Sequence, residues 1–558
     1  ISAEQVTTWN PELIAHPTLI DRYDTDIVHV RTLQNLLRWL QATPRMRSLV
    51  AGQLQPQFNT IPVSPRTDFN AEQNLAIERA MQMQDYLLIH GPPGTGKTSV
   101  IAEIVKRFCQ QGQRLMLAAF TNQAVDNMLK RIDKEGFHDY IRLGHERSVD
   151  NSVQERLLKT IVAQKQLSAM DIAHESLLKD ERGESVGYLS PRQGASFSAS
   201  VGWSGANVHE ILRTSPVVAS TTATWSSEKY THNGTGNDND DSPLQFDVAL
   251  IDEAGQLTVP AILGALRFAK RFILVGDEKQ LPPLVLSKEA AALGLARSLF
   301  SELKQRDEDY KKNNSKVVSA CVPLRIQYRM HRQISDFAST TFYNGLLIPD
   351  RSVANRVLKL APTGLWSTTT SLAIKQAIHP GSPLVFLDVR SKQESNGAKI
   401  SNAEARTVRE VVAELLLQGI LEAEIGIIAP YRAQVANLRR HLFSDDPANG
   451  WRGLKPHSAL SIDTVDRFQG GERLVIIMSF ATTSPPAVDS LQHDFLTNPN
   501  RLNVALTRAQ RKLILVGCAP ALAHLPFFQR LLTHCQRLNT LIPHRAFTSP
   551  QAGGTYGE

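Results

Sequence analysis

The 558-residue sequence predicts an α/β protein with two parallel-sheet domains, the first of which carries an inserted subdomain. Two observations support this fold class. Short apolar runs alternate with helical patterns in two separate blocks of the chain, and strands that alternate with helices form parallel sheets covered on both faces. The chain also exceeds the length that one hydrophobic core can serve, so about three or four domains are expected.

The first block covers residues 68–144 and 214–320. Its predicted strands are Tyr86–His90, Arg114–Ala119, Tyr140–Leu143, Val217–Ser220, Phe246–Ile251 and Arg271–Val275. Residues 1–67 precede it as an accessory segment. Four leucines there recur at helical spacing and predict a packing face: Leu33, Leu36, Leu37 and Leu40.

Residues 145–213 interrupt the alternation and predict the inserted subdomain, and residues 226–242 are expected to form a disordered surface loop. The second block covers residues 321–541. Its predicted strands are Leu384–Val389, Ile425–Ala429, Leu474–Ser479 and Lys512–Val516. Residues 542–558 are rich in small and turn-forming residues and predict a flexible tail.

The composition is that of an ordinary globular protein, with 42% hydrophobic and 21% charged residues. The net charge of +7 permits nucleic-acid binding without requiring it. The four cysteines are scattered, and no His, Cys or carboxylate group has metal-ligand spacing. With no membrane span and no secretory signal, we expect a protein that is cytoplasmic, or in the nucleoid or nucleus if it acts on DNA, and not secreted.

The most informative motif is Gly91-Pro92-Pro93-Gly94-Thr95-Gly96-Lys97-Thr98, between an apolar run and a helical pattern. It fits the phosphate-binding loop, so Gly91, Pro92, Gly94, Thr95 and Gly96 are expected to surround the phosphates of a nucleoside triphosphate. Lys97 is expected to reach the β and γ phosphates, and the Thr98 hydroxyl to ligate Mg²⁺. A plain glycine turn is the alternative, and the spacing and context argue against it.

Carboxylates follow a later apolar run, Val248–Ile251. In a nucleoside triphosphatase, Asp252 holds Mg²⁺ and Glu253 polarises the attacking water. Acidic strand ends are common, so this pair is informative only because a phosphate loop precedes it. The next predicted strand, Arg271–Val275, is followed by the segment Gly276–Pro283. Gln280 in this segment is a candidate sensor of the γ-phosphate, and a surface turn is the alternative.

Taken in order, these motifs resemble those of superfamily 1 helicases. Three later segments resemble motifs of the 5′-to-3′ branch, typified by the nonsense-mediated-decay helicase and the replication nuclease-helicases: Leu324–His331, Asp463–Glu472 and Arg501–Ala509. The resemblance covers residues 68–518 and implies two RecA-like motor domains that share one ATP. The family often has a β-barrel before the first motif; because only residues 1–67 precede that motif here, we expect the barrel to be absent, reduced or lost with an upstream part. Four scattered cysteines build neither the iron–sulfur nuclease nor the zinc domain of the two branches.

The resemblance also implies roles for individual residues. Gln73 is similar to the glutamine that reads adenine, Tyr328 is expected to stack on the adenine, and Glu472 to bind the ribose. Arg329 and Arg508 are expected to act as arginine fingers on the γ-phosphate. For a single arginine, a surface salt bridge is the alternative.

Nucleic-acid contacts are expected where strands end, because hydroxyl, amide and backbone N–H groups suit phosphate oxygens. The candidates are Thr121, Asn122, Thr224, Pro430, Tyr431 and Thr464. Tyr431 or Trp225 could stack on a base, although aromatic residues at strand ends are more often packing residues.

The predicted function is an ATP- and Mg²⁺-dependent helicase or translocase, moving 5′ to 3′ along a single strand and acting at duplex junctions. A single-strand clamp or ribonucleoprotein remodeller without processive unwinding remains an alternative, as does a nucleotide-regulated scaffold. DNA is favoured over RNA as the partner, although phosphate contacts do not separate the two. We expect a monomer that does not bind membranes, with a nuclease or accessory domain upstream in a longer parent chain.

Overall fold

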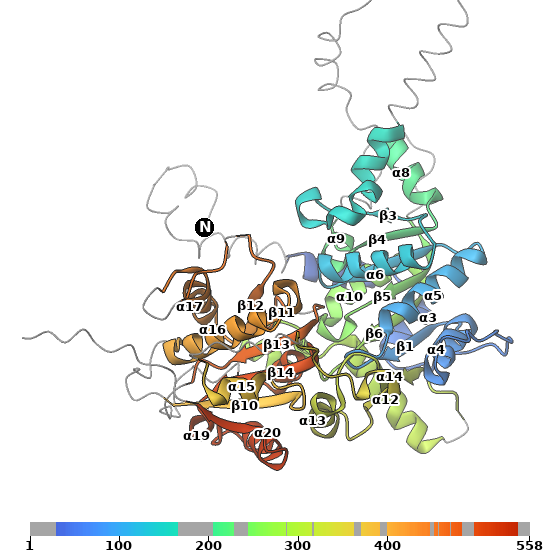
Figure 1. The fold of residues 1–558 in the computed structure, drawn as a ribbon. Coiled ribbons are helices and arrows are strands. Elements are labelled where there is room, and N and C mark those ends of the chain that lie inside the picture. The colour runs from blue at the N-terminus through green and yellow to red at the C-terminus, as the bar shows by residue number, and fades with distance from the viewer. Residues whose placement is uncertain are drawn as a thin grey trace, which may run out of the picture. The chain divides into compact units, whose positions relative to one another are not determined.

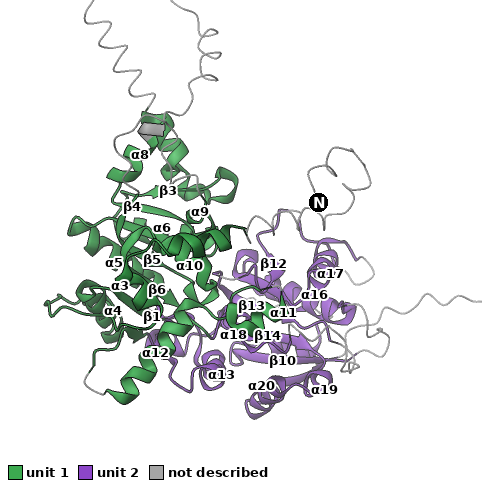
Figure 2. Ribbon diagram, turned by 180° about the vertical axis from the view of Figure 1, so that it is seen from behind, with its two compact units in different colours: residues 1–90, 97–278, 282–323 green, residues 91–96, 279–281, 324–558 purple. Residues whose placement is uncertain are grey.

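The computed structural model describes residues 30–165, 205–227, 244–285, 287–314, 317–361, 370–390, 399–446, 451–455, 457–468, 470–482 and 496–544. The chain divides into two compact units (Figure 2). Unit 1 comprises Ile1–His90, Lys97–Glu278 and Pro282–Pro323. Unit 2 comprises Gly91–Gly96, Lys279–Leu281 and Leu324–Glu558.

Unit 1 contains a parallel sheet with the strand order β3-β4-β2-β5-β6-β1-β7 (Figure 1). Its strands are β1 (Tyr86–His90), β2 (Leu115–Ala119), β3 (Ile141–Arg142), β4 (Val217–Thr221), β5 (Phe246–Ile251), β6 (Ala269–Gly276) and β7 (Cys321–Pro323). Most residues of these strands are buried, as expected for a parallel sheet covered on both faces.

Helices cover this sheet, and most begin at a side-chain cap. They are α3 (Pro44–Val50), α4 (Ala71–Gln82), α5 (Lys97–Gln110), α6 (Asn122–Lys134), α8 (Gly205–Thr214), α9 (Thr222–Trp225), α10 (Val259–Leu266), α11 (Lys288–Ala290) and α12 (Leu299–Asn313). The short helical turns are η2 (Glu146–Ser148), η3 (Asn151–Arg156), η5 (Ala254–Gln256) and η6 (Ala291–Leu295). Helices α4, α5 and α6 pack against β1 and β2, whereas residues of α3, α10 and α12 join one core cluster with Leu88, Met116 and Phe272.

Unit 2 contains a second parallel sheet, with the order β12-β11-β13-β14-β10-β15. Its strands are β10 (Leu384–Val389), β11 (Ile425–Ala429), β12 (Ser461–Thr464), β13 (Arg473–Ser479), β14 (Ala509–Gly517) and β15 (Leu541–His544). Successive residues of one strand enter different cores: Phe386 belongs to one cluster, and Val385 and Leu387 to the other. This alternation shows that both faces of the sheet are buried. A two-stranded sheet pairs β8 (Ile326–Gln327) with β9 (Ile348–Pro349).

The helices of unit 2 divide between the two faces. One core includes residues of α13 (Arg332–Phe342), α18 (Pro499–Leu506), α19 (Ala519–Leu522) and α20 (Pro526–Arg537). The other includes residues of α15 (Leu372–Ile378), α16 (Asn402–Leu417) and α17 (Arg432–Phe443). The short elements α14 (Arg351–Ala354) and η7 (Glu422–Glu424) complete the unit. The predicted α/β class with two parallel sheets is therefore confirmed.

Some boundaries differ from the predicted ones. The second block was expected from residue 321, but β7 pairs with β1 and belongs to the first sheet. The tail was expected to be flexible from residue 542, but β15 pairs with β10 through His544. Both strands lie at sheet edges and are short, which is why their patterns are weak. The rest of the tail lies outside the described residues, as do residues 228–242 of the predicted disordered loop.

The leucine stripe does not form the packing face that its spacing predicts. Helical residues 30–39 bury Asn35 and Trp39, whereas Leu33, Leu37 and Leu40 are exposed. Asn35 Nδ2 donates to Ser226 Oγ at 2.9 Å. Because residues four apart share a helix face, the packed face is defined by Asn35 and Trp39, and the leucines lie on another side.

The described ends of the predicted insertion belong to unit 1. Leu158, Val162 and Leu212 are part of its core, and residues 166–204 lie outside the described residues. In the part of the chain that the structure describes, no helix is both long and apolar enough to cross a membrane.

Candidate functional site

The glycine loop follows β1 and leads into α5, in the predicted order of strand, loop and helix. Gly94 and Gly96 have positive φ angles of 77° and 80°, a conformation that glycine adopts without strain. The hydroxyl of buried Thr95 donates to the Pro92 carbonyl at 2.8 Å and closes the loop on itself. A Cβ at Gly94 would lie 2.7 Å from the Cβ of Arg329, so no larger residue fits there.

Lys97 and Thr98 form the start of α5, and the N-terminus of a helix is favourable for an anion. Asp252 follows β5 and is buried. Burial raises the pKa of Asp252, and the charge of Lys97 opposes this shift. The Asp252 carboxylate and the Thr98 hydroxyl are hard oxygen ligands of the kind that Mg²⁺ prefers. A buried carboxylate with a raised pKa also gains from a nearby cation, so the donor set fits this metal.

Glu253 occupies the left-handed backbone region, with φ 55° and ψ 29°. A non-glycine residue there is strained, and such strain concentrates at functional sites. The Glu253 amide donates to Asp252 Oδ1 at 2.8 Å, which fixes the turn. Thr121 Oγ1 lies 3.5 Å from Glu253 Oε2, so the predicted strand contact and the predicted catalytic carboxylate are neighbours in unit 1.

Gln73 lies in the first turn of α4 and takes part in a capping box. The Asn70 side chain accepts from the Gln73 amide at 2.9 Å, and Gln73 Oε1 accepts from the Asn70 amide at 3.1 Å. This reciprocal cap positions the buried side chain of Gln73. The structure thus assigns Gln73 a structural role, and its predicted part in adenine recognition stays a prediction.

The predicted arginines of unit 2 lie in one network. Arg329 Nε donates to Glu472 Oε2, and Arg329 Nη1 donates to the Thr507 carbonyl at 3.1 Å. Gln510 donates to the other oxygen of Glu472 at 2.9 Å. Burial opposes ionisation of Glu472, but Arg329, Gln510 and Arg508 outweigh it and hold the pKa of this carboxyl below its usual value.

Arg508 is buried and donates from Nε to the Val504 carbonyl at 2.9 Å. Its Nη2 lies 3.4 Å from Gln280 Oε1, so the predicted sensor and a predicted arginine finger meet in unit 2. Tyr328 is exposed, and its amide donates to the Gly94 carbonyl at 2.8 Å. The glycine loop is thereby attached to the segment that contains Tyr328 and Arg329.

The predicted nucleic-acid contacts of unit 1 lie near the carboxyl ends of adjacent strands. Ala119 of β2 pairs with Thr221 of β4, and Thr121 and Thr224 follow these strands. Thr121 caps α6, accepting from the Ala124 amide at 3.1 Å. The hydroxyls of Thr221 and Thr224 lie 3.0 Å apart.

Asn122 is held by a buried network that the sequence does not reveal. Its Oδ1 accepts from Arg142 Nη2 at 2.8 Å. The fully buried Arg142 also donates to Asp126 Oδ1 at 2.8 Å, and the Asp150 amide donates to Asp126 Oδ2 at 2.9 Å. The side-chain oxygen of Asn122 therefore already accepts a hydrogen bond from the protein.

In unit 2, the predicted nucleic-acid contacts likewise lie near the carboxyl ends of two adjacent strands, β11 and β12. Ala429 pairs with Thr464, and Pro430 and Tyr431 follow β11 directly. Pro430 is buried, whereas Tyr431 and Thr464 are partly exposed. The ammonium of Lys399 lies 5.3 Å from the centre of the Tyr431 ring.

Aromatic residues at these strand ends behave differently. Trp225 is buried against Phe246 and Phe268, so it is a packing residue and cannot stack on a base. Phe120, between β2 and Thr121, is 44% exposed. The predictions did not single it out, and its position directly before the Thr-Asn pair was the available signal.

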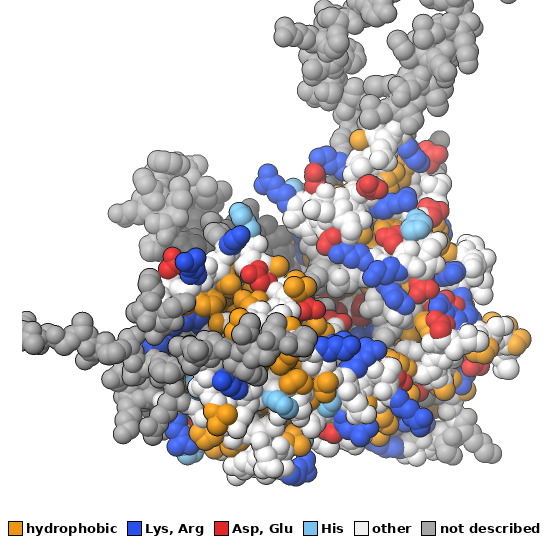
Figure 3. Space-filling model, viewed as in Figure 1, with side chains coloured by type: hydrophobic (Ala, Val, Ile, Leu, Met, Phe, Trp, Pro, Cys, Tyr) orange, Lys and Arg blue, Asp and Glu red, His pale blue; other side chains and the backbone are white. Residues whose placement is uncertain are grey.

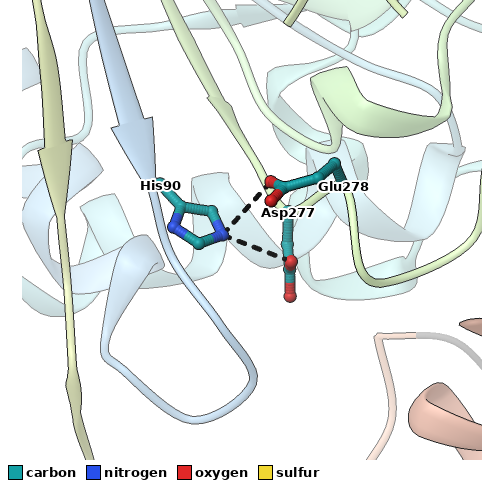
Figure 4. A group of neighbouring side chains, drawn as sticks. All are labelled: His90, Asp277 and Glu278. Atoms are coloured by element: carbon teal, nitrogen blue, oxygen red, sulfur yellow. Dashed lines mark ion pairs between the residues drawn. The ribbon is translucent and has the colours of Figure 1, made fainter. Parts of the chain in front are cut away.

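The structure also joins three residues that are distant in sequence. His90 Nε2 lies 3.4 Å from Asp277 Oδ1 and 3.2 Å from Glu278 Oε2 (Figure 4). These residue types can hold a metal ion. Sequence spacing missed the group because β1 and β6 become neighbours only in the sheet.

Comparisons with known proteins agree across most of the chain. Two family profiles, both described as an AAA domain, match residues 68–193 with 203–288, and residues 295–520. The chain is 30% identical over 538 residues to the DNA replication ATP-dependent helicase/nuclease DNA2 of Xenopus laevis, covering 92% of this chain and 44% of that protein.

A plant relative, the DNA replication ATP-dependent helicase/nuclease JHS1 of Arabidopsis thaliana, is 31% identical, with coverage of 83% and 29%. DNA-binding protein SMUBP-2 of Rattus norvegicus is 29% identical, with coverage of 81% and 43%. The chain therefore spans less than half the length of these relatives. Among solved structures, the helicase nonstructural protein 10 of an arterivirus covers 79% of this chain and 61% of its own, at 12% identity and a TM-score of 0.34.

Proposed function

Because the chain belongs to superfamily 1 of the helicases, we propose that it is an ATP-dependent helicase or translocase that moves 5′ to 3′ along a single strand. One observation carries the proposal: the strained Glu253 and the buried Asp252 follow β5 directly, with the charge of Lys97 acting on Asp252. Lys97 supplies a cation that can bind phosphates, Asp252 a carboxylate that can hold a metal ion, and Glu253 a carboxylate that can orient water.

The proposed nucleotide is ATP, bound with Mg²⁺. The glycine loop and the start of α5 would bind the phosphates, and Thr98 and Asp252 would hold the metal. Mg²⁺ supplies neutralisation of the charge that develops on the phosphate oxygens. Tyr328 is exposed and suited to stacking on adenine, and Glu472 and Gln73 are the proposed ribose and adenine contacts.

Hydrolysis is assigned to groups of this chain with distinct tasks. Glu253 accepts a hydrogen bond from the attacking water and orients it. Arg329 and Arg508 stabilise negative charge on the γ-phosphate, and Gln280, beside Arg508, reports its presence. For Arg329, this role requires that its pair with Glu472 be exchanged for the nucleotide.

Two grips on a single strand are proposed, one in each unit. In unit 1 the grip consists of Thr121, Asn122 and Thr224, with the exposed Phe120 ring available for stacking. In unit 2 it consists of Tyr431 and Thr464, and the buried Pro430 is proposed to shape the backbone that presents Tyr431. Hydroxyl and backbone groups at strand ends hold phosphates without reading sequence. Lys and Arg side chains are scattered among apolar and acidic ones on the face of Figure 3, which favours many modest contacts over one basic patch.

The proposed substrate is DNA. The relatives are a DNA replication helicase/nuclease and a DNA-binding protein by name, and this supports DNA over RNA. We also propose that this motor region works as a monomer, within a longer protein that carries a nuclease or accessory domain, in whichever compartment holds the DNA.

Strand displacement tests the proposal directly. Duplexes with a 5′ tail or a 3′ tail, made in DNA and in RNA, are incubated with the protein, ATP and Mg²⁺. The proposal predicts ATP-dependent displacement of the 5′-tailed DNA duplex. Stimulated ATP hydrolysis without displacement on either tail would contradict it and support a single-strand clamp.

A further inference from the structure

Two strands of unit 1 end side by side and continue into segments of unit 2. Strand β1 ends at His90 and continues as Gly91–Gly96, and β6 ends at Gly276 and continues through Asp277 and Glu278 into Lys279–Leu281. His90 pairs with Gly276 in the sheet. His90, Asp277 and Glu278 therefore lie at the base of both segments.

The three side chains lie close together at this base. His90 Nε2 faces both carboxylates at 3.2–3.4 Å, and its side chain is 14% exposed (Figure 4). The Asp277 side chain is 1% exposed. Lys304 of α12 donates to the other oxygen of Glu278 at 2.6 Å, and the His90 ring lies 6.4 Å from that of Phe300.

The ammonium of Lys304 argues against a metal ion at this group. Lys304 pairs with Glu278 at 2.6 Å and also with Glu308 at 3.7 Å. A divalent cation at Glu278 would lie close to this ammonium in a largely buried place, where repulsion between like charges is costly. His90 Nε2 makes no hydrogen bond of good geometry, but it approaches both carboxylates, at distances that suit an N–H placed between two acceptors.

The same base touches the turn that presents Glu253. A Cβ on Gly255 would lie 2.9 Å from the Asp277 carbonyl, and a Cβ on Gly276 would lie 2.9 Å from the Gly255 amide. The backbone after β6 is therefore packed directly against the backbone two residues beyond Glu253. A displacement of Asp277 would be transmitted to that turn.

Both segments make contacts of their own in unit 2. The Gly94 carbonyl accepts from the Tyr328 amide at 2.8 Å, and the Lys279 carbonyl accepts from Asn503 Nδ2 at 2.7 Å. Each segment thus runs from the His90 cluster to a residue of a predicted helicase motif.

We propose that His90 is a positioning residue: it ties the base of the glycine loop to the base of Lys279–Leu281, so that the two segments move together when nucleotide and strand bind. This inference rests on the proposed function. Without the tie, the loop still binds phosphates through its own residues. Binding of a nucleic-acid single strand then no longer aligns Gln280 and the turn at Glu253 with the glycine loop. ATP turnover stimulated by the single strand therefore falls.

The test compares His90→Ala with His90→Gln, which keeps an N–H donor, and with the control His138→Gln. His138 is an exposed histidine that pairs with Asp133 at 2.9 Å. Single-strand-stimulated kcat is expected to fall about 10- to 100-fold in His90→Ala, the loss expected when reacting groups are misplaced by ~1 Å. The KM for ATP should change less than about threefold. His90→Gln should recover most of the loss, and the control should match the wild type.

Hydrogen–deuterium exchange gives a second readout that needs no catalytic activity. Residues 91–96 and 279–281 should both exchange faster in His90→Ala, and neither should change in His138→Gln. Unchanged exchange in either segment, or an unchanged stimulated kcat, overturns the tie. Zinc binding would also overturn the proposal. If zinc binds to the wild type and not to His90→Gln, the cluster is a metal site.

The outcomes separate this inference from the proposed function. If the wild type shows no strand-stimulated hydrolysis above Lys97→Ala, the proposed function fails, and the exchange experiment still decides the role of His90. If the wild type is stimulated and His90→Ala equals it, only the positioning role fails.

Discussion

The acidic residues of unit 1 and the arginines of unit 2 reach their positions by different means. Asp252 and Glu253 are placed by backbone geometry, at the end of a buried strand and in a strained turn. Arg329 and Arg508 are placed by side-chain pairing, the first with Glu472 and the second with Val504 and Gln280.

This difference separates a preorganised part of the proposed site from an exchangeable part. A carboxylate on a rigid strand end needs no rearrangement to meet a metal or a water. An arginine paired with a carboxylate must exchange that partner for a phosphate, so its contribution depends on the competition between the two. The acidic residues of unit 1 are therefore expected to determine whether ATP hydrolysis occurs. The arginines of unit 2 are expected to determine when it occurs.

The largest effect is expected for Lys97→Ala. Loss of the ammonium removes the cation that faces the phosphates, and ATP hydrolysis should fall by at least about 10³-fold. Binding of a labelled single strand should remain close to wild type in fluorescence anisotropy. Lys130→Ala, an exposed position on α6, serves as the control. Persistent ATP turnover in Lys97→Ala would show that the phosphates bind elsewhere.

Arg508→Ala tests the exchangeable part. If Arg508 acts as an arginine finger, strand-stimulated kcat should fall about 10³-fold or more. Arg508→Lys should recover little, because an ammonium cannot reproduce the planar fork of a guanidinium. Arg297→Ala, in an exposed ion pair, should leave the rate unchanged. A thermal melt must show that the buried position tolerates the change, and a wild-type rate in a folded Arg508→Ala protein would remove this residue from the mechanism.

Asp126→Ala sharpens the comparison by testing side-chain pairing within unit 1. The change leaves the fully buried guanidinium of Arg142 without its carboxylate, and the free energy of unfolding should drop by about 3–5 kcal/mol. Single-strand affinity should fall as well, since Arg142 also orients Asn122. Lys130→Ala breaks an exposed pair on the same helix and should cost less than about 1 kcal/mol in urea unfolding. Equal losses of unfolding free energy in Asp126→Ala and Lys130→Ala would mean that the buried network contributes no more to stability than the exposed pair.

The smallest effect is expected from Glu472→Gln and depends on pH. The folded pKa of Glu472 lies below its ordinary 4.5, so its ionised form stabilises unit 2 above that value, and this contribution disappears as the pH falls through the folded pKa. At neutral pH the variant should be less stable by under about 1 kcal/mol, because Glu472 is partly exposed. The difference should shrink on acidification below 4.5 in urea unfolding. A difference that grows would contradict the pairing.

Buried parallel strands were the most predictable part of the fold. Strands β1, β5, β10 and β11 match the predicted ranges, because strands buried on both faces need uninterrupted apolar runs. Edge strands β7 and β15 were not predicted, because strands that are short and paired on one side carry little pattern. The leucine spacing marked a helix correctly but not the face that packs, which depends on the neighbours that Asn35 and Trp39 meet.

Local patterns along the chain were enough to predict the fold class, the family and the order of the phosphate loop and the acidic strand end. Those features depend on local patterns: apolar runs, glycines at positive φ and residues within one turn of a strand end. The folded structure was needed to show which distant groups meet, namely Arg329 with Glu472, Arg142 with Asn122, and His90 with Asp277 and Glu278. The reason is physical: contacts between distant residues follow from strand order and register, and no local pattern in the chain encodes which strands become neighbours.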